Sequence, residues 1–372
     1  MNRRYIILLG LFLVTSMGIV NALEVTKVTC EMMVDPLAVV SGQPRFGWQM
    51  KASENGAMQS AYEVEVYKLQ NGQRVTVWES GKVASSQSQL VSYKGGKLQS
   101  GAKYLWRVKV WDERNKPSEW SNEGIFRLAP DTSCLDAEWI GAISHEDAKL
   151  PYGRKFHGTE LKKPEVKALW AAVDTLAKKS ICLRKDFIAE KQLEEAVAYV
   201  CGLGHYEFSL NGKKVGDGEF TPLWSDYEKT VYYNVYDVTS LLNQGGNAIG
   251  ILLGNGFYNV QGGRYRKLQI SFGAPTLFFK LIMKYTDGTQ KEVLSGADWK
   301  YSLSPITFNC IYGGEDYDAR LEQKGWNMPG FDDTAWRPVV VQRVPKGELC
   351  PQQAPSVKIM ERYGIKSVHK LT

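Results

Sequence analysis

The sequence lacks the concentrated positive charge that proteins use to hold nucleic acids. It has 46 Lys and Arg residues against 40 Asp and Glu residues, so its formal net charge of +6 is spread thinly over 372 residues. Beyond the first few residues no long run of Lys or Arg occurs. We therefore expect no nucleic-acid partner, because such binding depends on clustered basic side chains that contact phosphates.

Cysteine is scarce, and no two cysteines are close in sequence. The six cysteines stand singly, without a Cys-x-x-Cys motif, so neither a zinc ribbon nor a redox pair is indicated. Cys182 and Cys201 flank two predicted neighbouring strands. Either a disulfide bridge or two buried free thiols would fit at these positions.

Long apolar runs are also absent, apart from one at the N-terminus. Arg3 and Arg4 precede an apolar stretch, Tyr5–Val20, which is short for a membrane-spanning helix and typical of a signal peptide. We predict that residues 1–22 are a signal peptide and that the mature chain begins at Leu23. The protein would then be exported to the periplasm or the medium, with no membrane span after cleavage. An uncleaved membrane anchor is the alternative.

Aromatic residues are abundant, and their spacing favours β-strands. The sequence has 19 Tyr and 11 Trp, which suit twisted sheets and sugar-contacting surfaces. Apolar and charged residues alternate along Tyr62–Tyr67 and Tyr104–Trp111, as expected for half-buried antiparallel strands. Turn residues such as Asn71-Gly72 recur about every ten residues. This pattern predicts a β-sandwich over residues 23–128.

A second sandwich is predicted over residues 137–344, after a linker at 129–136. Its clearest strand is Leu277–Met283, and its sharpest hairpin turns are Asn211-Gly212 and Asp287-Gly288. Residues 162–179, rich in Ala, Leu, Glu and Lys, predict a short helical insertion at the surface. Residues 345–372 have weak periodicity and are interpreted as a linker.

Two loops of the second sandwich combine aromatic rings with short polar side chains. One carries Trp224 and Asp226, and the other, rich in glycine, is expected to expose Asn255 and Tyr258 at a loop tip. Sugars stack their apolar faces on aromatic rings, and their hydroxyls need fixed hydrogen-bond acceptors. These four residues are the predicted carbohydrate contacts. Alternatively, Trp224 belongs to the core and Asp226 caps a turn.

Several motifs follow one another in an order that resembles a known family. They are Leu-Asn-Gly-Lys-Lys-Val-Gly-Asp from residue 210, Trp-x-Asp-Tyr from 224, Tyr-Asp-Val-Thr from 236 and Leu-Gly-x-Gly-Phe-Tyr from 253. This set resembles the N-terminal β-sandwich of bacterial α-L-rhamnosidases of glycoside hydrolase family 78. Upstream, Pro-Arg-Phe-Gly-Trp from residue 44 resembles the fibronectin-like domain that precedes it in that family.

The resemblance implies an all-β chain of two antiparallel sandwiches, the first fibronectin III- or immunoglobulin-like and the second a jelly roll of the galactose-binding type. The family hydrolyses terminal α-L-rhamnose residues with inversion, using acids in an α/α barrel that follows these sandwiches. No such helices occur in this sequence, so residues 345–372 are expected to lead into a catalytic region that is not present. We assign no catalytic residue here.

The resemblance therefore predicts a non-catalytic portion of a secreted α-L-rhamnosidase that binds rhamnose-containing glycans. A first alternative is one subunit of a split, active enzyme whose partner is a separate catalytic chain. A second is a structural or adhesive surface protein, because fibronectin-like domains are common spacers.

Acidic residues near the C-terminus raise the question of a metal site. Asp316 and Asp318 alternate on a predicted strand and could share one face, where a structural or cation-binding role is favoured over catalysis. Asp332-Asp333, shortly before Trp336, is typical of a turn and N-cap. No cofactor is required by this reading. Calcium could bind, through ligands that the sequence leaves unknown.

Overall fold

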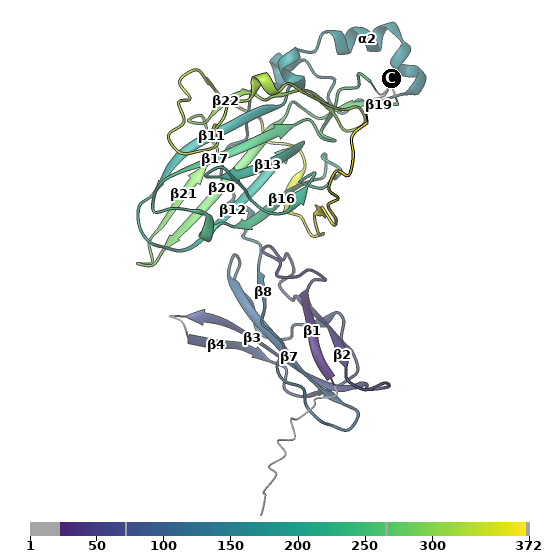
Figure 1. Ribbon diagram of the computed structural model, residues 1–372, viewed down its shortest axis with the longest axis vertical. Helices are drawn as coiled ribbons and strands as arrows, with labels where there is room; N and C mark the ends of the chain where they lie inside the picture. Colours follow the sequence, from purple (N-terminus) through teal and green to yellow (C-terminus); the bar gives the residue numbers. More distant parts are fainter. Residues whose placement is uncertain (1–22, 71–72, 265–266, 370–372) are drawn as a thin grey trace, which may run out of the picture. The chain divides into compact units, whose positions relative to one another are not determined.

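The structure is a computed structural model that describes residues 23–70, 73–264 and 267–369. These residues divide into two compact units (Figure 1). The first comprises most of residues 23–125. The second comprises the chain from residue 126 on, together with Pro36–Gly42 and Leu98–Lys103. The predicted signal peptide and the predicted turn at 71–72 lie outside the described residues.

The first unit is an antiparallel β-sandwich, as predicted. Along β7 every second residue is buried. Rings from the two sheets pack against each other, with Phe46 and Trp106 at 4.4 Å and Trp48 and Tyr62 at 5.3 Å between ring centroids. The sheet orders are β1-β2-β6 (Leu23–Cys30, Arg45–Ala52, Val91–Ser92) and β4-β3-β7-β8 (Gln73–Glu79, Gln59–Gln70, Lys103–Asp112, Gly124–Arg127), with β5 (Val83–Ala84) paired to β3.

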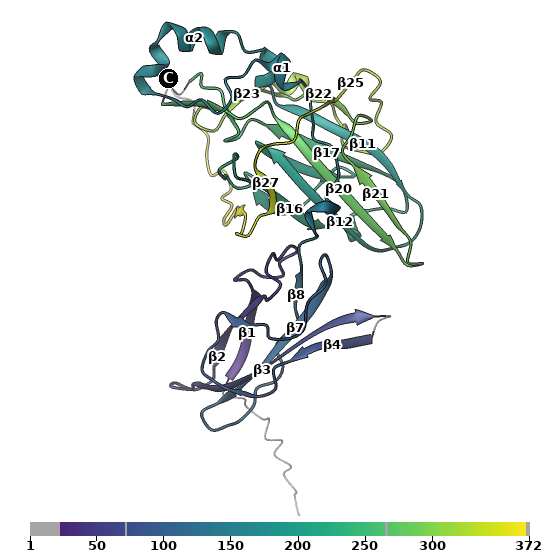
Figure 2. The ribbon, with the colours of Figure 1, turned by 180° about the vertical axis from the view of Figure 1, so that it is seen from behind.

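The second unit contains a larger sandwich of two sheets (Figures 1 and 2). The six-stranded sheet has the order β14-β13-β17-β11-β22-β25 (Lys213–Lys214, His205–Leu210, Gly245–Gly254, Ile181–Ala189, Lys300–Leu303, Arg337–Pro338). The seven-stranded sheet has the order β26-β9-β20-β12-β16-β27 (Val340–Val341, Ile140–Gly141, Thr276–Tyr285, Leu193–Leu203, Thr230–Asp237, Glu348–Pro351), with β21 (Gln290–Leu294) paired to β20. The prediction of an all-β fold is confirmed.

Alternation along the strands separates a core between the sheets from a second apolar layer outside them. Ile181 and Leu183 of β11 and Val200 of β12 belong to the central core, whereas Cys201 belongs to the layer outside the seven-stranded sheet. Cys182 lies between two core residues on β11, so it points out of the opposite sheet. The two thiols therefore face away from each other. Both thiols are free, so the free-thiol alternative is confirmed and the disulfide bridge is wrong.

Smaller sheets and turns complete the second unit. They are β10-β19-β18 (Phe156–His157, Leu268–Ser271, Asn259–Val260), β15-β28 (Gly218–Glu219, Val357–Lys358) and β23-β24 (Ile306–Cys310, Gly314–Tyr317). Single 3₁₀ turns cover Thr132–Cys134, Gly158–Lys162, Thr175–Lys178, Thr239–Leu241 and Ala319–Leu321.

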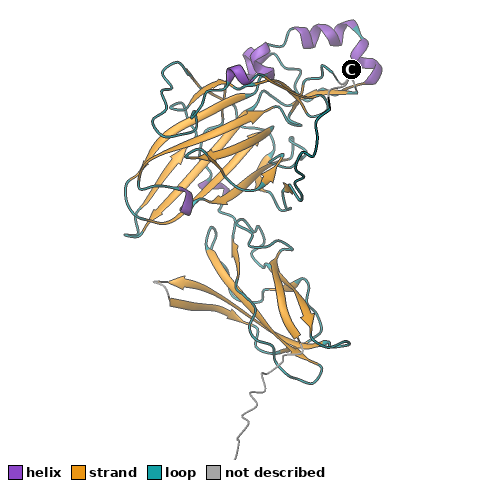
Figure 3. Cartoon of the chain, in the orientation of Figure 1, coloured by secondary structure: helices purple, strands orange, loops and turns teal. Residues whose placement is uncertain are grey.

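The predicted helical insertion is present. α1 (His145–Ala148) and α2 (Pro164–Ala171) lie at one end of the second unit (Figure 3). Pro164 begins α2, where its missing N–H is not needed. On one side of α2, Val166 and Trp170 are buried in a small apolar cluster that is separate from the central core. Among the described residues no helix has the length and apolar character needed to cross a membrane.

The second unit extends beyond the predicted end at residue 344. Glu348–Pro351 forms β27, which pairs in parallel with β16, and Val357–Lys358 forms β28, which pairs with β15. The boundary at 344 is therefore too early. Local periodicity could not reveal these strands, because each is short and its partner lies more than a hundred residues away in sequence.

Candidate functional site

An open cleft of about 460 Å³ lies on the outer face of the six-stranded sheet. His205 and Glu207 of β13 and Leu252 of β17 form its floor, and each alternates with a residue of the central core. The hairpin β23-β24 provides a wall through residues such as Asn309 and Glu315. The volume lies within the range of small-molecule sites in proteins.

Aromatic rings from separate segments meet beside the cleft, and two of them, His205 and Phe220, line it. The ring of Phe257 lies 6.1 Å from Trp224, 6.1 Å from His205 and 6.0 Å from Tyr312, between centroids. His205 in turn lies 5.8 Å from Phe220. Trp224 and Phe220 are 65% and 63% exposed, respectively. Large aromatic side chains with that much exposure leave ring faces open to a ligand.

The backbone at Phe220 adopts a conformation that is costly for a bulky residue. Its φ is +54°, in the left-handed region that glycine tolerates and most side chains avoid. The next residue holds it there, because Thr221 accepts a hydrogen bond from the Tyr206 N–H at 2.9 Å and donates its hydroxyl to the Tyr206 carbonyl at 3.2 Å. Strain of this kind, in an exposed ring beside a cleft, indicates a functional position.

Carboxylates lie beside these rings. Glu207, Glu219 and Glu315 line the cleft. Lys214 of β14 pairs with Glu219 at 2.9 Å and with Glu207 at 3.6 Å. Burial acts to lower the pKa of Lys214, but its hydrogen bonds and charge attraction to the two carboxylates outweigh that effect and raise it. The lysine thus ties the two carboxylates to one point beside the cleft.

The structure places Trp224 and Asp226 at the surface. The prediction that Trp224 is open to solvent is confirmed, and the alternative that it belongs to the core is wrong. Asp226 is exposed and caps its own turn, where it accepts from the Glu228 N–H at 3.3 Å and pairs with Lys229 at 3.3 Å. Sugar contact through either residue stays a prediction.

The expectation that Asn255 and Tyr258 reach solvent is wrong. Asn255 is fully buried, and its amide donates to the Lys178 carbonyl and the Asn309 Oδ1, both at 2.9 Å. Tyr258 is 7% exposed and packs with Tyr227 in the outer apolar layer. Burial raises its pKa well above the ordinary value. The glycines of this loop permit close backbone packing instead of exposing a tip.

The acidic residues near the C-terminus do not form a metal cluster. Asp316 pairs with Arg264, whereas Asp318 caps the next turn and pairs with Arg320 at 2.6 Å. Throughout residues 23–70, 73–264 and 267–369 no group of three or more His, Cys, Asp or Glu side chains is placed to hold a metal ion. Asp332 accepts from the Thr334 N–H at 3.1 Å, in the turn that the sequence predicts.

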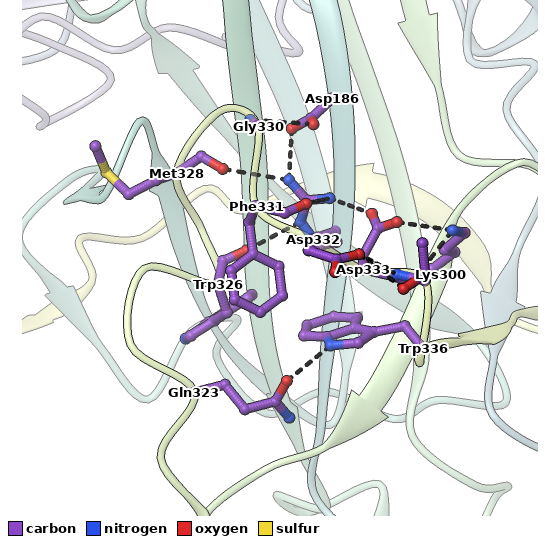
Figure 4. Close-up of polar contacts among 12 residues, drawn as sticks. Asp186, Lys300, Gln323, Trp326, Met328, Gly330, Phe331, Asp332, Asp333 and Trp336 are labelled. Atoms are coloured by element: carbon purple, nitrogen blue, oxygen red, sulfur yellow. Dashed lines mark hydrogen bonds and ion pairs between the residues drawn. The ribbon is translucent and has the colours of Figure 1, made fainter.

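A buried arginine anchors the loop that follows β24. Arg184 of β11 has a side chain that is 1% exposed and donates to the carbonyls of Trp326 at 3.0 Å and Met328 at 3.2 Å. It also pairs with Asp186 at 2.6 Å and with Asp333. Figure 4 shows Asp333 bound to Lys300 on its other side, and the Trp336 indole donating to Gln323. These contacts fix the loop to the outer face of the sheet.

Sequence reasoning missed Phe220, which lines the cleft, and the neighbouring rings of Phe257 and Tyr312. His205 and Phe257 stand inside the two densest motifs, so motif membership was a usable signal for them. Phe220 and Tyr312 carry no such signal. Phe220 follows β15 and Tyr312 lies in the turn between β23 and β24, so only the folded chain brings these two rings beside His205 and Phe257.

The half-buried His205 predicts a pH dependence of stability. Burial lowers the pKa of His205 to about 4, whereas an unfolded histidine titrates near 6.5. Between pH 4 and pH 6.5 the imidazole is therefore protonated in the unfolded chain and neutral in the folded chain. The stability that neutral His205 contributes is therefore complete above pH 6.5 and is lost as the pH falls toward 4.

We expect acidification from pH 7 to about pH 4.5 to cost the wild type about 2 kcal/mol more than it costs His205→Gln. Urea unfolding at a series of pH values measures both proteins. Superimposable pH profiles would contradict this assignment, because the carboxylates common to both proteins contribute equally to each curve.

Comparison with known proteins places these features in a family. The profile described as the alpha-L-rhamnosidase N-terminal domain matches residues 191–361, and that of the Rha78A-like, N-terminal immunoglobulin domain matches residues 25–130. These are N-terminal domains of the α-L-rhamnosidase family. The rings and carboxylates of the cleft all fall within the first of the two matches.

Two α-L-rhamnosidases illustrate the relationship. That of Formosa agariphila is 36% identical over 359 residues, which are 94% of this chain and 37% of the relative. That of an Alteromonas species is 32% identical over 351 residues, 92% of this chain and 35% of the relative. The chain thus spans about a third of the length of these α-L-rhamnosidases and corresponds to their N-terminal region.

Solved α-L-rhamnosidase structures share the fold. The enzyme of Dictyoglumus thermophilum is 31% identical with a TM-score of 0.72, over 91% of this chain and 36% of that one. The enzyme of Streptomyces avermitilis, solved with L-rhamnose, is 25% identical with a TM-score of 0.74, over 91% of this chain and 47% of that one.

Proposed function

We propose that this chain supplies carbohydrate binding to an α-L-rhamnosidase, and that its ligand is a glycan ending in α-L-rhamnose. The observation that carries the proposal is the pair of exposed rings, Phe220 and Trp224, beside a cleft lined by carboxylates. The choice of rhamnose rests on the names of the relatives, and the rings and carboxylates of the cleft are chemically suited to that sugar. Export of the chain is part of the proposal, because plant and microbial glycans lie outside the cell.

The chemistry of a deoxyhexose suits this arrangement. Its methyl group and apolar ring face would stack on Phe220 or Trp224, and its vicinal hydroxyls would donate to the carboxylates of Glu207, Glu219 or Glu315. The neutral imidazole of His205 can both donate and accept a hydrogen bond. Stacking and hydrogen bonding together fix the orientation of a sugar.

Of the residues predicted from the sequence, we assign direct contact to Trp224 and Asp226. Asp226 follows Trp224 in the same exposed loop, so its carboxylate would meet a sugar seated on the indole. Asn255 instead fixes the wall of the cleft through its hydrogen bond to Asn309, and Tyr258, which is buried in the outer apolar layer, is assigned no sugar contact.

Calorimetric titration with methyl α-L-rhamnopyranoside tests the proposal. We expect Trp224→Ala and Phe220→Ala each to weaken binding about tenfold, which corresponds to about 1.4 kcal/mol. Ile188→Ala is the matched control, because Ile188 is an exposed apolar residue at the far end of β11, outside the cleft. Its affinity should equal that of the wild type.

The titration is run once with calcium and once with a chelator, since calcium could take part in binding. Absence of heat from the wild type under both conditions would overturn the proposed function. Equal affinity of the wild type and both aromatic variants would mean that the sugar does not bind at these two rings.

A further inference from the structure

The floor of the cleft continues across the sheet to a second hollow. In the strand register Glu207 of β13 lies beside Leu252 of β17, which lies beside Cys182 of β11. A second hollow of about 290 Å³ has Cys182 and Leu252 in its floor. Leu252 and Ile306 line both spaces. The cleft and the second hollow therefore adjoin across the strands at Leu252, and the two spaces together are called the groove.

Two glycines of β17 set how closely the covering segments approach the sheet. A Cβ on Gly250 would lie 2.5 Å from the Cβ of Asn327, and a Cβ on Gly254 would lie 3.3 Å from Asn309 Oδ1. The covering chain thus touches the sheet at these two positions. Leu252 lies between them on the same face of β17 and lines both spaces.

The second hollow repeats the chemistry of the first. Tyr317 lines it and is 55% exposed, and its hydroxyl donates to the Glu322 carboxylate. Trp326 adds a second ring, and the amides of Gln323 and Asn327 add donors and acceptors. An aromatic face beside fixed polar groups is the combination that a sugar ring requires.

We infer that the groove binds two consecutive sugar units of one glycan, the terminal unit in the cleft and the next unit in the second hollow. Adjacent strands are about 4.8 Å apart, so Glu207 and Cys182 are separated by two strand spacings, a length that accommodates two linked pyranose rings. This inference rests on the proposed function and adds the ligand class, an oligosaccharide of at least two units.

Parallel titrations with a monosaccharide and a disaccharide test the inference. The probes are methyl α-L-rhamnopyranoside and the methyl glycoside of an α-L-rhamnosyl-L-rhamnose disaccharide. We expect the disaccharide to bind the wild type about tenfold more tightly. Tyr317→Ala should remove this gain and leave monosaccharide affinity unchanged. Leu321→Ala, an exposed apolar residue outside both spaces, is the control and should keep the gain.

The outcomes separate the inference from the proposed function. If neither probe binds the wild type, the proposed function fails and the inference fails with it. If both probes bind with equal affinity, the proposed function stands and the second sugar position is wrong. If Tyr317→Ala weakens both probes equally, the second hollow does not hold a separate sugar unit.

Discussion

Replacing Arg184 with methionine is expected to destabilise the second unit by about 4 kcal/mol, because it removes a buried cation that binds two carboxylates and two main-chain carbonyls at once. Asp333 would lose one of its two cations, and the carbonyls of Trp326 and Met328 would lose their buried donor. Methionine fills a similar volume, so the loss comes from charge and hydrogen bonding and not from a cavity. The melting temperature should fall by about 10 °C.

Lys185→Met provides the matched control for Arg184→Met. Lys185 is the next residue on β11, and its partner Asp298 is largely exposed. Such a surface pair contributes at most about 1 kcal/mol. Thermal and urea unfolding compare the two variants with the wild type. Similar small losses in both variants would mean that the loop is not held by Arg184.

Gly204→Ala is the second substitution with a large expected effect. A Cβ at this position would lie 2.0 Å from the carbonyl oxygen of Asn255, 2.4 Å from its carbonyl carbon and 2.8 Å from the Cα of Gly256. All three atoms belong to the backbone, so no side-chain rotation can relieve the clash. We expect a loss of about 3 kcal/mol, at the upper end of overpacking costs.

The same substitution should disturb the cleft. The two backbone segments that would be forced apart carry His205 on one side and Asn255 and Gly256 on the other, and all three residues line the cleft. Affinity for a rhamnoside should fall together with stability. Gly246→Ala is the control, since a Cβ there meets nothing within 4 Å and its φ is ordinary. We expect that variant to be as stable as the wild type. Equal melting temperatures for both variants would contradict the close approach at Gly204.

The fold can be predicted from the sequence because its strands and turns are marked by residues close together in the chain. The Asn211-Gly212 turn was predicted from its residue types, and both residues have the positive φ that such a turn needs, +50° and +80°. Alternation identified the strands, and β20 (Thr276–Tyr285) contains the predicted stretch Leu277–Met283 in full. These signals depend on residues within a few positions of one another, so one sequence is enough to read them.

The candidate site depends on contacts that no local pattern records. The sequence interprets Gly254 and Gly256 as spacers that expose Asn255. In the structure Gly256 lets two backbone segments approach, and Gly254 faces the side chains of Asn309 and Ser180. Glycine permits both arrangements, and the sequence does not distinguish them. Phe220 and Tyr312 likewise meet around Phe257 and His205 only after the sheet has formed.

The hydrogen bonds that hold the helical insertion end on its backbone. The side-chain amide of Asn259 donates to the Ala177 carbonyl at 2.8 Å, and that of Asn255 donates to the Lys178 carbonyl at 2.9 Å. A main-chain carbonyl is present whatever residue occupies the position. Substitution at 177 or 178 would therefore leave the acceptors of these hydrogen bonds in place, and packing alone restricts the buried Ala177. Asn255 and Asn259, in contrast, are the positions at which a substitution would remove the donors. The exposed positions of the insertion are thus free to diverge in sequence, and a segment with the same backbone path and the same apolar side could be grafted in its place.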